Sequence, residues 1–269
     1  MENKTDIIWL DSTDSTNEEA RRHILSLDNL SVVSALEQTS GRGQRGNSWH
    51  SDTGKNLTFS IVLKHPSDSS GDYSPLTAHS QTLISELTAV SVREYLATLG
   101  IEASVKWPND IIAGDKKICG ILIEHSVRGN LLSHSIIGIG LNINQKVFGT
   151  FVPNATSIIL EKGPEASESD IRQSLEDFMK IFKDNYSRYL RDVDGHKRLR
   201  EEYLSRLWRI NQDAAYMDLK GQHPTMFRGR ITGLSDIGHL LVQTEEGEFR
   251  EFAFKEIGFL YQDFIDAMT

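Results

Sequence analysis

The chain contains one cysteine among its 269 residues. A single thiol excludes an intramolecular disulfide and a zinc site built from several thiolates, and such sparse cysteine is typical of proteins in a reducing cytoplasm. The residue, Cys119, lies in the apolar run Ile118–Ile123. We therefore expect Cys119 to be a small buried hydrophobic residue and not a catalytic nucleophile.

The sequence also lacks a long apolar segment. No stretch approaches the roughly 18 apolar residues that a membrane helix requires. The N-terminal segment Met1–Asp11 is too polar for a secretory signal peptide. These absences predict a protein that neither spans a membrane nor is exported, and hence a cytoplasmic location.

Basic residues are fewer than acidic residues in this chain. The chain has 29 Lys and Arg residues against 38 Asp and Glu residues, so its formal net charge is 29 − 38 = −9. This balance argues against a protein whose main activity is to bind nucleic acid, although it is compatible with a local basic site for a phosphate. The 38% apolar and 25% charged residues are ordinary for a globular protein.

Hydrophobic periodicity predicts helices and strands in the first hundred residues. A helix begins near Ser15, because the segment from Thr16 has capping-box spacing. Its apolar face would contain Ala20, Ile24 and Leu27. Two strands and a longer helix follow, at Ser31–Leu36, Leu57–Leu63 and Leu76–Leu99.

Three further strands, separated by short turn signals, predict an antiparallel meander. They span Ser104–Ala113, Lys117–His125 and Leu131–Asn144. Two helices are expected after them, over Ser169–Leu190 and His196–Trp208. The predicted fold class is therefore α+β, with a mixed, largely antiparallel sheet flanked by helices.

The pattern changes after residue 211. Short strands over Thr225–Leu234, Leu240–Thr244 and Glu248–Phe254 are separated by turns that contain glycine and acidic residues. Such closely spaced short strands predict a small β-barrel. We therefore expect two domains, residues 1–211 and residues 212–269.

A glycine-rich segment, Gly41–Gly46, is the first candidate ligand site. Its glycines allow the backbone to approach a ligand closely and to direct amide N–H groups at an anion. Arg42 and Arg45 add guanidinium donors suited to phosphate or carboxylate, and Trp49 offers a flat face for a base. Taken alone, the segment would equally suit an exposed basic turn, and it matches neither the Walker nor the dinucleotide-binding pattern.

Two further segments carry candidate ligand-binding side chains. In Lys106–Asp110, a lysine closes an apolar strand beside a proline and could present a fixed cation, although a surface lysine next to a turn would explain the segment on its own. In Gly138–Asn144, glycines inside a strand indicate the close approach of a ligand or of another backbone. Asn142 and Asn144 would share one face and could bind polar edges or sugar hydroxyls.

Together, these motifs strongly resemble the biotin protein ligase family. In order along the chain they are Ser-Thr-Asn from Ser15, Gly-Arg-Gly-x-Arg-Gly from Gly41 with a following Trp, Lys-Trp-Pro-Asn-Asp from Lys106, and Gly-x-Gly-x-Asn-x-Asn from Gly138. The match spans residues 15–144, and the Lys-Trp-Pro-Asn-Asp run is its most specific part. The resemblance implies a catalytic domain similar to class II synthetases and an SH3-like C-terminal barrel.

The resemblance also implies roles for single residues. Those that match biotin-binding positions are Ser15, Thr16, Asn17, Gln38, Gly41, Arg42, Gly43, Lys106, Gly120, Ile121 and Leu122. Those that match positions around ATP and the adenylate are Arg42, Gln44, Arg45, Trp49, Lys106, Asn142 and Asn144. Lys106 matches the catalytic lysine, and Arg42 matches the basic residue nearest the biotin carboxylate and the α-phosphate. Similar proteins commonly carry basic residues where Gln44 and Asn47 stand here, so Arg45 is a candidate for part of their role.

The implied activity is that of an ATP-dependent ligase. Biotin and ATP, with Mg²⁺, would form biotinyl-5′-AMP, and a lysine of a biotin carboxyl carrier domain, such as that of acetyl-CoA carboxylase, would receive the biotinyl group. Asp110 is a candidate proton acceptor for the attacking amine. The alternatives are a lipoate–protein ligase and a non-catalytic biotin-binding module. Because Ser15 lies near the chain start, we expect neither an N-terminal DNA-binding domain nor DNA as a partner, and a homodimer is left open.

Overall fold

The computed structural model describes residues 6–68, 73–149 and 154–260. The chain divides into two compact units, Met1–Tyr203 and Leu204–Thr269. The expected domain boundary between residues 211 and 212 stays a prediction, because compactness alone does not show where an independently folding domain ends.

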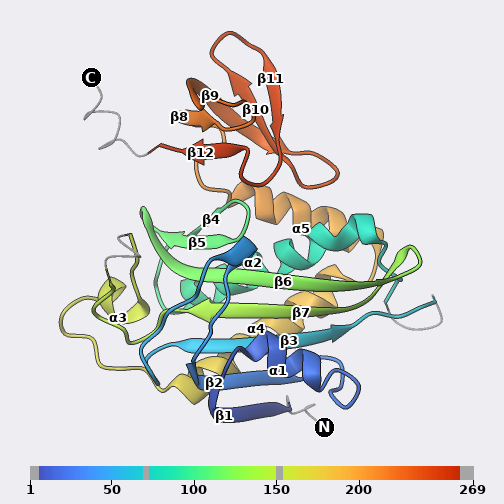
Figure 1. Ribbon diagram of the computed structural model, residues 1–269, viewed down its shortest axis with the longest axis vertical. Coiled ribbons are helices and arrows are strands. Elements are labelled where there is room, and N and C mark those ends of the chain that lie inside the picture. Colours follow the sequence, from blue (N-terminus) through green and yellow to red (C-terminus); the bar gives the residue numbers. More distant parts are fainter. Residues whose placement is uncertain (1–5, 69–72, 150–153, 261–269) are drawn as a thin grey trace. The chain divides into compact units, whose positions relative to one another are not determined.

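A seven-stranded sheet forms the centre of the first unit (Figure 1). Its order is β1-β2-β3-β7-β6-β5-β4, in which β1 and β2 run parallel and all other neighbours are antiparallel. The strands are β1 (Ile7–Thr13), β2 (Val32–Gln38), β3 (Leu57–Lys64), β4 (Ser104–Lys106), β5 (Asp110–Ala113), β6 (Lys116–Arg128) and β7 (Leu131–Leu141). The expected mixed, largely antiparallel sheet is confirmed, and β5, β6 and β7 form the expected meander.

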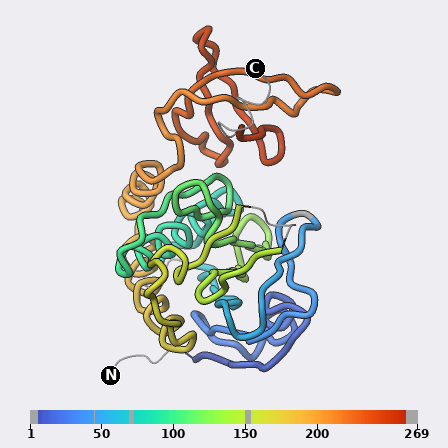
Figure 2. Tube along the Cα trace, turned by 90° about the vertical axis from the view of Figure 1, so that its left-hand side faces the viewer, coloured from blue at the N-terminus to red at the C-terminus, as the bar shows by residue number. Residues whose placement is uncertain are grey.

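Helices cover both faces of this sheet (Figures 1 and 2). Asn17 of α1 lies against Gly138 of β7 on one face. Strand residues alternate between faces, and on the other face Phe178 of α4 packs edge-on against Phe59 of β3, with ring centroids 5.4 Å apart. The helices are α1 (Thr16–Arg22), α2 (Thr82–Thr98), α3 (Ile158–Glu161), α4 (Ile171–Tyr189) and α5 (Val193–Ser205), with 3₁₀ turns η1 (Gln44–Gly46) and η2 (Ala78–Gln81). Within the described ranges, no helix combines the length and the apolar content of a membrane span.

The first helix is shorter than its sequence pattern predicts. α1 ends at Arg22, so Ile24 and Leu27 follow it in a turn. Leu27 is nevertheless buried in one cluster with Ala20 and Val62, and Ile24 packs against that cluster. The apolar spacing predicted burial correctly but not the end of the helix, because a turn can place the same side chains in the same core.

The strand predicted over residues 104–113 is instead a tight hairpin, with β4 and β5 as its arms. Its turn contains a cis peptide bond between Trp107 and Pro108. Proline has no N–H to donate to a strand ladder and therefore interrupts a continuous strand. The hairpin makes Lys106 and Asp110 direct cross-strand partners.

The second unit contains a five-stranded antiparallel sheet in the order β11-β10-β9-β8-β12. The predicted strands at 225–234 and 240–244 are confirmed as β9 (Thr225–Leu234) and β10 (Leu240–Thr244), and the third is confirmed in part as β11 (Phe249–Phe252). Two strands, β8 (Asp213–Asp218) and β12 (Ile257–Phe259), are absent from the sequence prediction. β12 has only three residues, and the β8 sequence Asp-Ala-Ala-Tyr-Met-Asp does not alternate apolar and polar residues.

A buried ion pair joins α2 to α5. The Glu86 side chain is 2% exposed, and its carboxylate lies 2.8 Å from the guanidinium of Arg200. Burial raises the pKa of Glu86 from its ordinary 4.5 to about 7, although Arg200 acts in the opposite direction. Because the folded protein binds this proton more tightly than the unfolded chain, the resulting stabilisation is present below pH 4.5 and is lost as the pH rises through 7.

The variant Glu86→Gln should remove this dependence. We expect the free energy of unfolding of the wild type, minus that of the variant, to fall by up to about 3 kcal/mol between pH 4.5 and 7, since one pKa unit corresponds to about 1.4 kcal/mol. Denaturant unfolding across this range measures the difference. Glu176→Gln, at an exposed position of α4, is the control. A difference for Glu86→Gln that stays constant with pH would contradict the analysis.

Candidate functional site

A chain of hydrogen bonds links the start of α1 to the sheet. Gln38, at the end of β2, accepts from the backbone N–H of Thr16 at 2.8 Å and from its hydroxyl at 3.2 Å. The Ser60 hydroxyl of β3 lies 2.8 Å from the Thr16 hydroxyl and 2.6 Å from Oδ1 of Asn17. The Asn17 amide donates in turn to the Glu124 carboxylate of β6 at 2.9 Å. Three predicted biotin-binding residues, Thr16, Asn17 and Gln38, thus belong to one polar network under α1.

Three glycines form a flat floor beside this network. Gly120 of β6 pairs with Gly140 of β7, and Gly138 lies on the same face two residues away. A Cβ added at Gly138 would lie 2.5 Å from Oδ1 of Asn17, and one added at Gly120 would lie 2.9 Å from the Trp49 ring. A Cβ at Gly140 would overlap the same indole. The groups that approach these strand glycines closely, as the sequence predicts for some group, are the side chains of Asn17 and Trp49.

The glycine-rich loop folds back on itself where it delivers Trp49 to this floor. Arg42 forms an antiparallel bridge with Ser48, and the turn η1 lies between them. A side chain at Gly41 would collide with the backbone carbonyl of Trp49. Gly46 has φ of +88°, a conformation that other residues adopt only with strain. The loop therefore requires glycine for backbone reasons at both ends.

Two lysines and a carboxylate meet near one end of the floor. Lys106, at the end of β4, is the cross-strand partner of Asp110 on β5. The Lys117 Nζ atom of β6 lies 2.6 Å from Asp110 Oδ1 and 5.6 Å from the centroid of the Trp49 ring. Lys117 Nζ would also be 3.1 Å from a Cβ at Gly120, so this lysine lies directly over the floor.

Arg42 belongs to a cluster of four charged side chains that lies farther along β6. Its guanidinium pairs with Glu18 of α1 and lies 3.4 Å from the Glu124 carboxylate. Arg21 pairs with the same two carboxylates at 2.6 and 2.7 Å. Because Glu124 also accepts from Asn17, the charged cluster is continuous with the polar network. The two arginines and two glutamates balance in charge.

Comparison with known proteins shows which family the chain belongs to. Residues 9–142, which include the whole floor and the glycine-rich loop, match the model of the biotin/lipoate A/B protein ligase family. The bifunctional ligase/repressor BirA of Bacillus spizizenii is 30% identical over 248 residues, which cover 90% of this chain and 70% of that protein. The chain belongs to this family, among its biotin protein ligases.

Further relatives support the same assignment. The biotin–[acetyl-CoA-carboxylase] ligase of Paracoccus denitrificans is 26% identical over 238 residues, which cover 87% of this chain and 93% of that protein. The biotin protein ligase from Aquifex aeolicus, solved in complex with biotin and ATP, is 25% identical with a TM-score of 0.72. That match covers 96% of this chain and 99% of the other. The protein is therefore a ligase enzyme with the biotin protein ligase fold.

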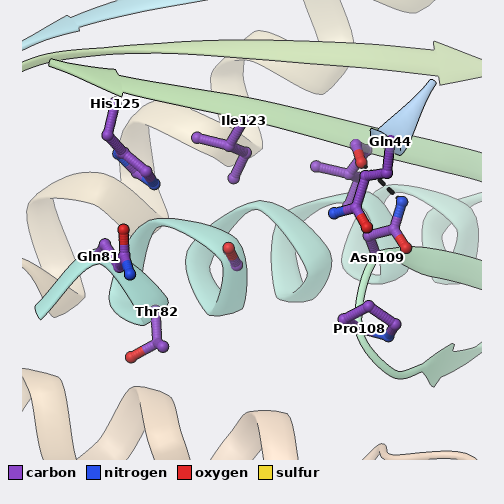
Figure 3. Close-up of a pocket in the computed structure, with 9 residues that line it drawn as sticks. Gln44, Gln81, Thr82, Pro108, Asn109, Ile123 and His125 are labelled. Carbon is purple, nitrogen blue, oxygen red and sulfur yellow. Dashed lines mark hydrogen bonds between the residues drawn. The ribbon is translucent and has the colours of Figure 1, made fainter. Parts of the chain in front are cut away.

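A pocket of about 240 Å³ lies beside β6 in this biotin protein ligase (Figure 3). It is lined by Gln44, Gln81, Thr82, Ser85, Pro108, Asn109, Ile121, Ile123 and His125. Ile121 lines it, whereas the carbonyl of Leu122 lies 3.4 Å from the Asn17 amide on the floor side. The three residues predicted to line the biotin site, Gly120, Ile121 and Leu122, are therefore divided between the floor and this pocket, because strand residues alternate.

His125 closes one end of the pocket in Figure 3 and is held by a shared hydroxyl. The Ser135 hydroxyl lies 2.8 Å from Nδ1 of His125 and 2.8 Å from Nε2 of His65. Burial lowers the pKa of both imidazoles to about 4. Both rings are therefore neutral near pH 7, and the pocket wall carries no positive charge from them.

The two asparagines predicted near the nucleotide hold neighbouring loops in the ligase. The Asn142 amide donates to the carbonyl of Thr156 at 2.9 Å. Asn144 both donates to the carbonyl of Ser169 and accepts from its N–H, each at 2.9 Å. Both residues are at most 4% exposed. Their expected contact with ATP stays a prediction.

The other predicted positions are placed as follows. Ser15 is buried and precedes the first turn of α1. In the glycine-rich loop, the N–H of Gly43 donates to the Asn47 carbonyl at 2.7 Å. The side chain of Arg45 lies outside the described residues, so its role also stays a prediction. Cys119 is fully buried, and burial raises the pKa of its thiol. The expectation of a small buried hydrophobic residue is confirmed.

Five residues of the site are absent from the sequence prediction: Glu18, Arg21, Ser60, Lys117 and Glu124. Each is a common residue in an ordinary helical or strand pattern, so no local signal distinguishes it. Strand pairing brings Ser60 and Glu124 to α1. Lys117 is placed over the floor by the short turn between β5 and β6.

The variant Gly140→Ala should displace Trp49 from the floor. We expect kcat/KM for biotin to fall at least tenfold, and the free energy of unfolding to fall by about 1–3 kcal/mol from overpacking. Pyrophosphate release and denaturant unfolding measure the two effects. Gly149→Ala is the control, because a Cβ there meets nothing within 4 Å. If kcat/KM and the free energy of unfolding of Gly140→Ala equal those of the wild type, the position of the Trp49 indole does not depend on the glycine floor.

Proposed function

We propose that the protein activates biotin as biotinyl-5′-AMP and transfers the biotinyl group to a lysine of a biotin carboxyl carrier domain. The observation that carries this proposal is the cationic site on a glycine floor: Lys117 pairs with Asp110 beside Trp49, and Lys106 is the cross-strand neighbour of Asp110, in a chain of net charge −9. Related proteins support it. One relative is named a biotin–[acetyl-CoA-carboxylase] ligase, and similar folds were solved with biotin and ATP and with biotinyl-5-AMP.

The polar network under α1 suits the uncharged end of biotin. A ureido group has two N–H donors and one carbonyl acceptor, and buried amides and hydroxyls can match both kinds. We assign Ser15, Thr16, Asn17 and Gln38 to this end. Asn17 is 2% exposed and already linked to Ser60 and Glu124, so it is held in a defined orientation.

The first chemical step joins two anions. An oxygen of the biotin carboxylate attacks the α-phosphorus of ATP, and the bond from that phosphorus to the pyrophosphate oxygen breaks. Fixed positive charge lowers the barrier because it stabilises the charge that accumulates on the phosphate oxygens. We assign Lys106, Lys117 and Arg42 to this task, with Trp49 and the loop from Gly41 covering the adenylate.

The second step uses the lysine of the acceptor. Its neutral amine attacks the acyl carbon, AMP leaves with the electron pair of the acyl–oxygen bond, and the amine loses a proton. Asp110 stays the candidate acceptor of that proton, and its ion pair with Lys117 at 2.6 Å orients the carboxylate. Water must be excluded meanwhile, because the mixed anhydride hydrolyses readily.

Mg²⁺ fits this site as a partner of the nucleotide. The carboxylates near the two ends of the floor, Asp110 and Glu124, are already paired with Lys117 and Arg21. Mg²⁺ is commonly held through phosphate oxygens and water, with one or two carboxylates. We therefore expect it to be carried by the phosphates of ATP, where it adds positive charge to the reacting groups. The cytoplasmic location, the absence of DNA binding and a homodimer stay predictions.

The decisive experiment combines the protein with an acceptor carrier domain, biotin and MgATP. Mass spectrometry should detect one biotinyl group on a lysine of the acceptor, together with pyrophosphate and AMP. Transfer of lipoate in place of biotin would favour the nearest alternative, a lipoate–protein ligase. Biotin binding without pyrophosphate release would favour the other alternative, a non-catalytic biotin-binding module. Either of these two results would refute the proposal.

The variant Lys106→Ala tests the assigned catalytic lysine. We expect its rate of biotin-dependent pyrophosphate release to fall at least a hundredfold, because loss of one preorganised cationic donor typically costs about 3 kcal/mol. Lys116→Ala removes an equal charge from an exposed position at the start of β6 and should leave the rate unchanged. Near-normal release by a folded Lys106→Ala protein would remove Lys106 from the mechanism.

A further inference from the structure

Glu18 has no role in the proposed chemistry, yet it makes a close contact with Arg42. One oxygen of its carboxylate binds the Arg42 guanidinium, and the other binds Arg21 at 2.6 Å. The side chains of Arg42 and Glu18 are 45% and 29% exposed. An anion that enters the site can therefore reach this pair.

The pair holds Arg42 away from the catalytic lysines. Its guanidinium lies next to Glu124, which pairs with Ile136 across the sheet. Lys117 lies over Gly120. Four strand residues separate Gly120 from Glu124, which corresponds to about 13 Å along β6. Arg42 thus lies at the end of the floor opposite Lys117.

The charge balance of this cluster determines the effect of a ligand carboxylate. Arg21, Arg42, Glu18 and Glu124 together are neutral. If the Arg42 guanidinium moves to the carboxylate of a ligand, Glu18 loses an ion-pair partner. If the ligand carboxylate moves to Arg42 instead, it lies beside the carboxylates of Glu18 and Glu124. In both cases the negative charge of Glu18 opposes the binding of a carboxylate.

We propose that Glu18 is the positioning residue of Arg42, and that it competes with the biotin carboxylate for the guanidinium. This inference rests on the proposed function. Glu18 keeps Arg42 at the Glu124 end until a ligand supplies a replacement carboxylate. The competition weakens the binding of biotin and not of analogues without a negative charge.

The variant Glu18→Gln tests the competition by titration calorimetry. We expect biotin to bind about two- to fivefold more tightly, the range for a partly exposed ion pair. The methyl ester of biotin, which is uncharged, should bind both proteins equally. Glu19→Gln is the matched control: Glu19 is the next residue of α1 and pairs with Arg22 and His23, so the same charge is lost without a change at Arg42.

A double-variant cycle shows whether the effect passes through Arg42. In the Arg42→Ala background, adding Glu18→Gln should leave the biotin affinity unchanged. An affinity for biotin that is unchanged or weaker in Glu18→Gln alone overturns the inference. Equal tightening of the methyl ester, or the same gain in Glu19→Gln, overturns it as well. If the wild type does not bind biotin at all, the proposed function itself is refuted.

Discussion

Asn17 and Trp49 can lie against the central sheet only because Gly138 and Gly140 carry no side chains. These glycines alternate with buried isoleucines on β7, and Gly120 on β6 pairs with Gly140. One face of two adjacent strands is therefore flat over several residues, while the other face packs against helices. The polar network, the position of the loop and the placement of Lys117 all depend on this flat surface.

Charge is arranged around the floor in matched pairs. Lys117 is held by Asp110 near one end, and Arg42 and Arg21 are held by Glu18 and Glu124 farther along β6. This arrangement lets a chain of net charge −9 keep cations in defined positions along β6, each beside a carboxylate. A carboxylate that orients a cation also lowers the net positive charge around it.

Much of the framework could be predicted from residue patterns. The alternating apolar residues of β3, the apolar stripe of α4 and two strands of the second sheet lie where periodicity places them. The failures are local. α1 ends at Arg22 because the chain turns before the apolar spacing ends, and the strand at 104–113 is a hairpin because Pro108 cannot continue a ladder.

The family and most of the motif residues can be identified from the order of residues alone, because glycines, a lysine before a proline and paired amides are chemically distinctive in that order. How these residues are used depends on the folded arrangement. It placed Lys117 beside Asp110, turned Ile121 away from the floor that Gly120 forms, and committed Asn142 and Asn144 to neighbouring loops. It also joined Glu18 to Arg42. Contacts between segments distant in sequence depend on strand pairing and packing, which no local pattern encodes.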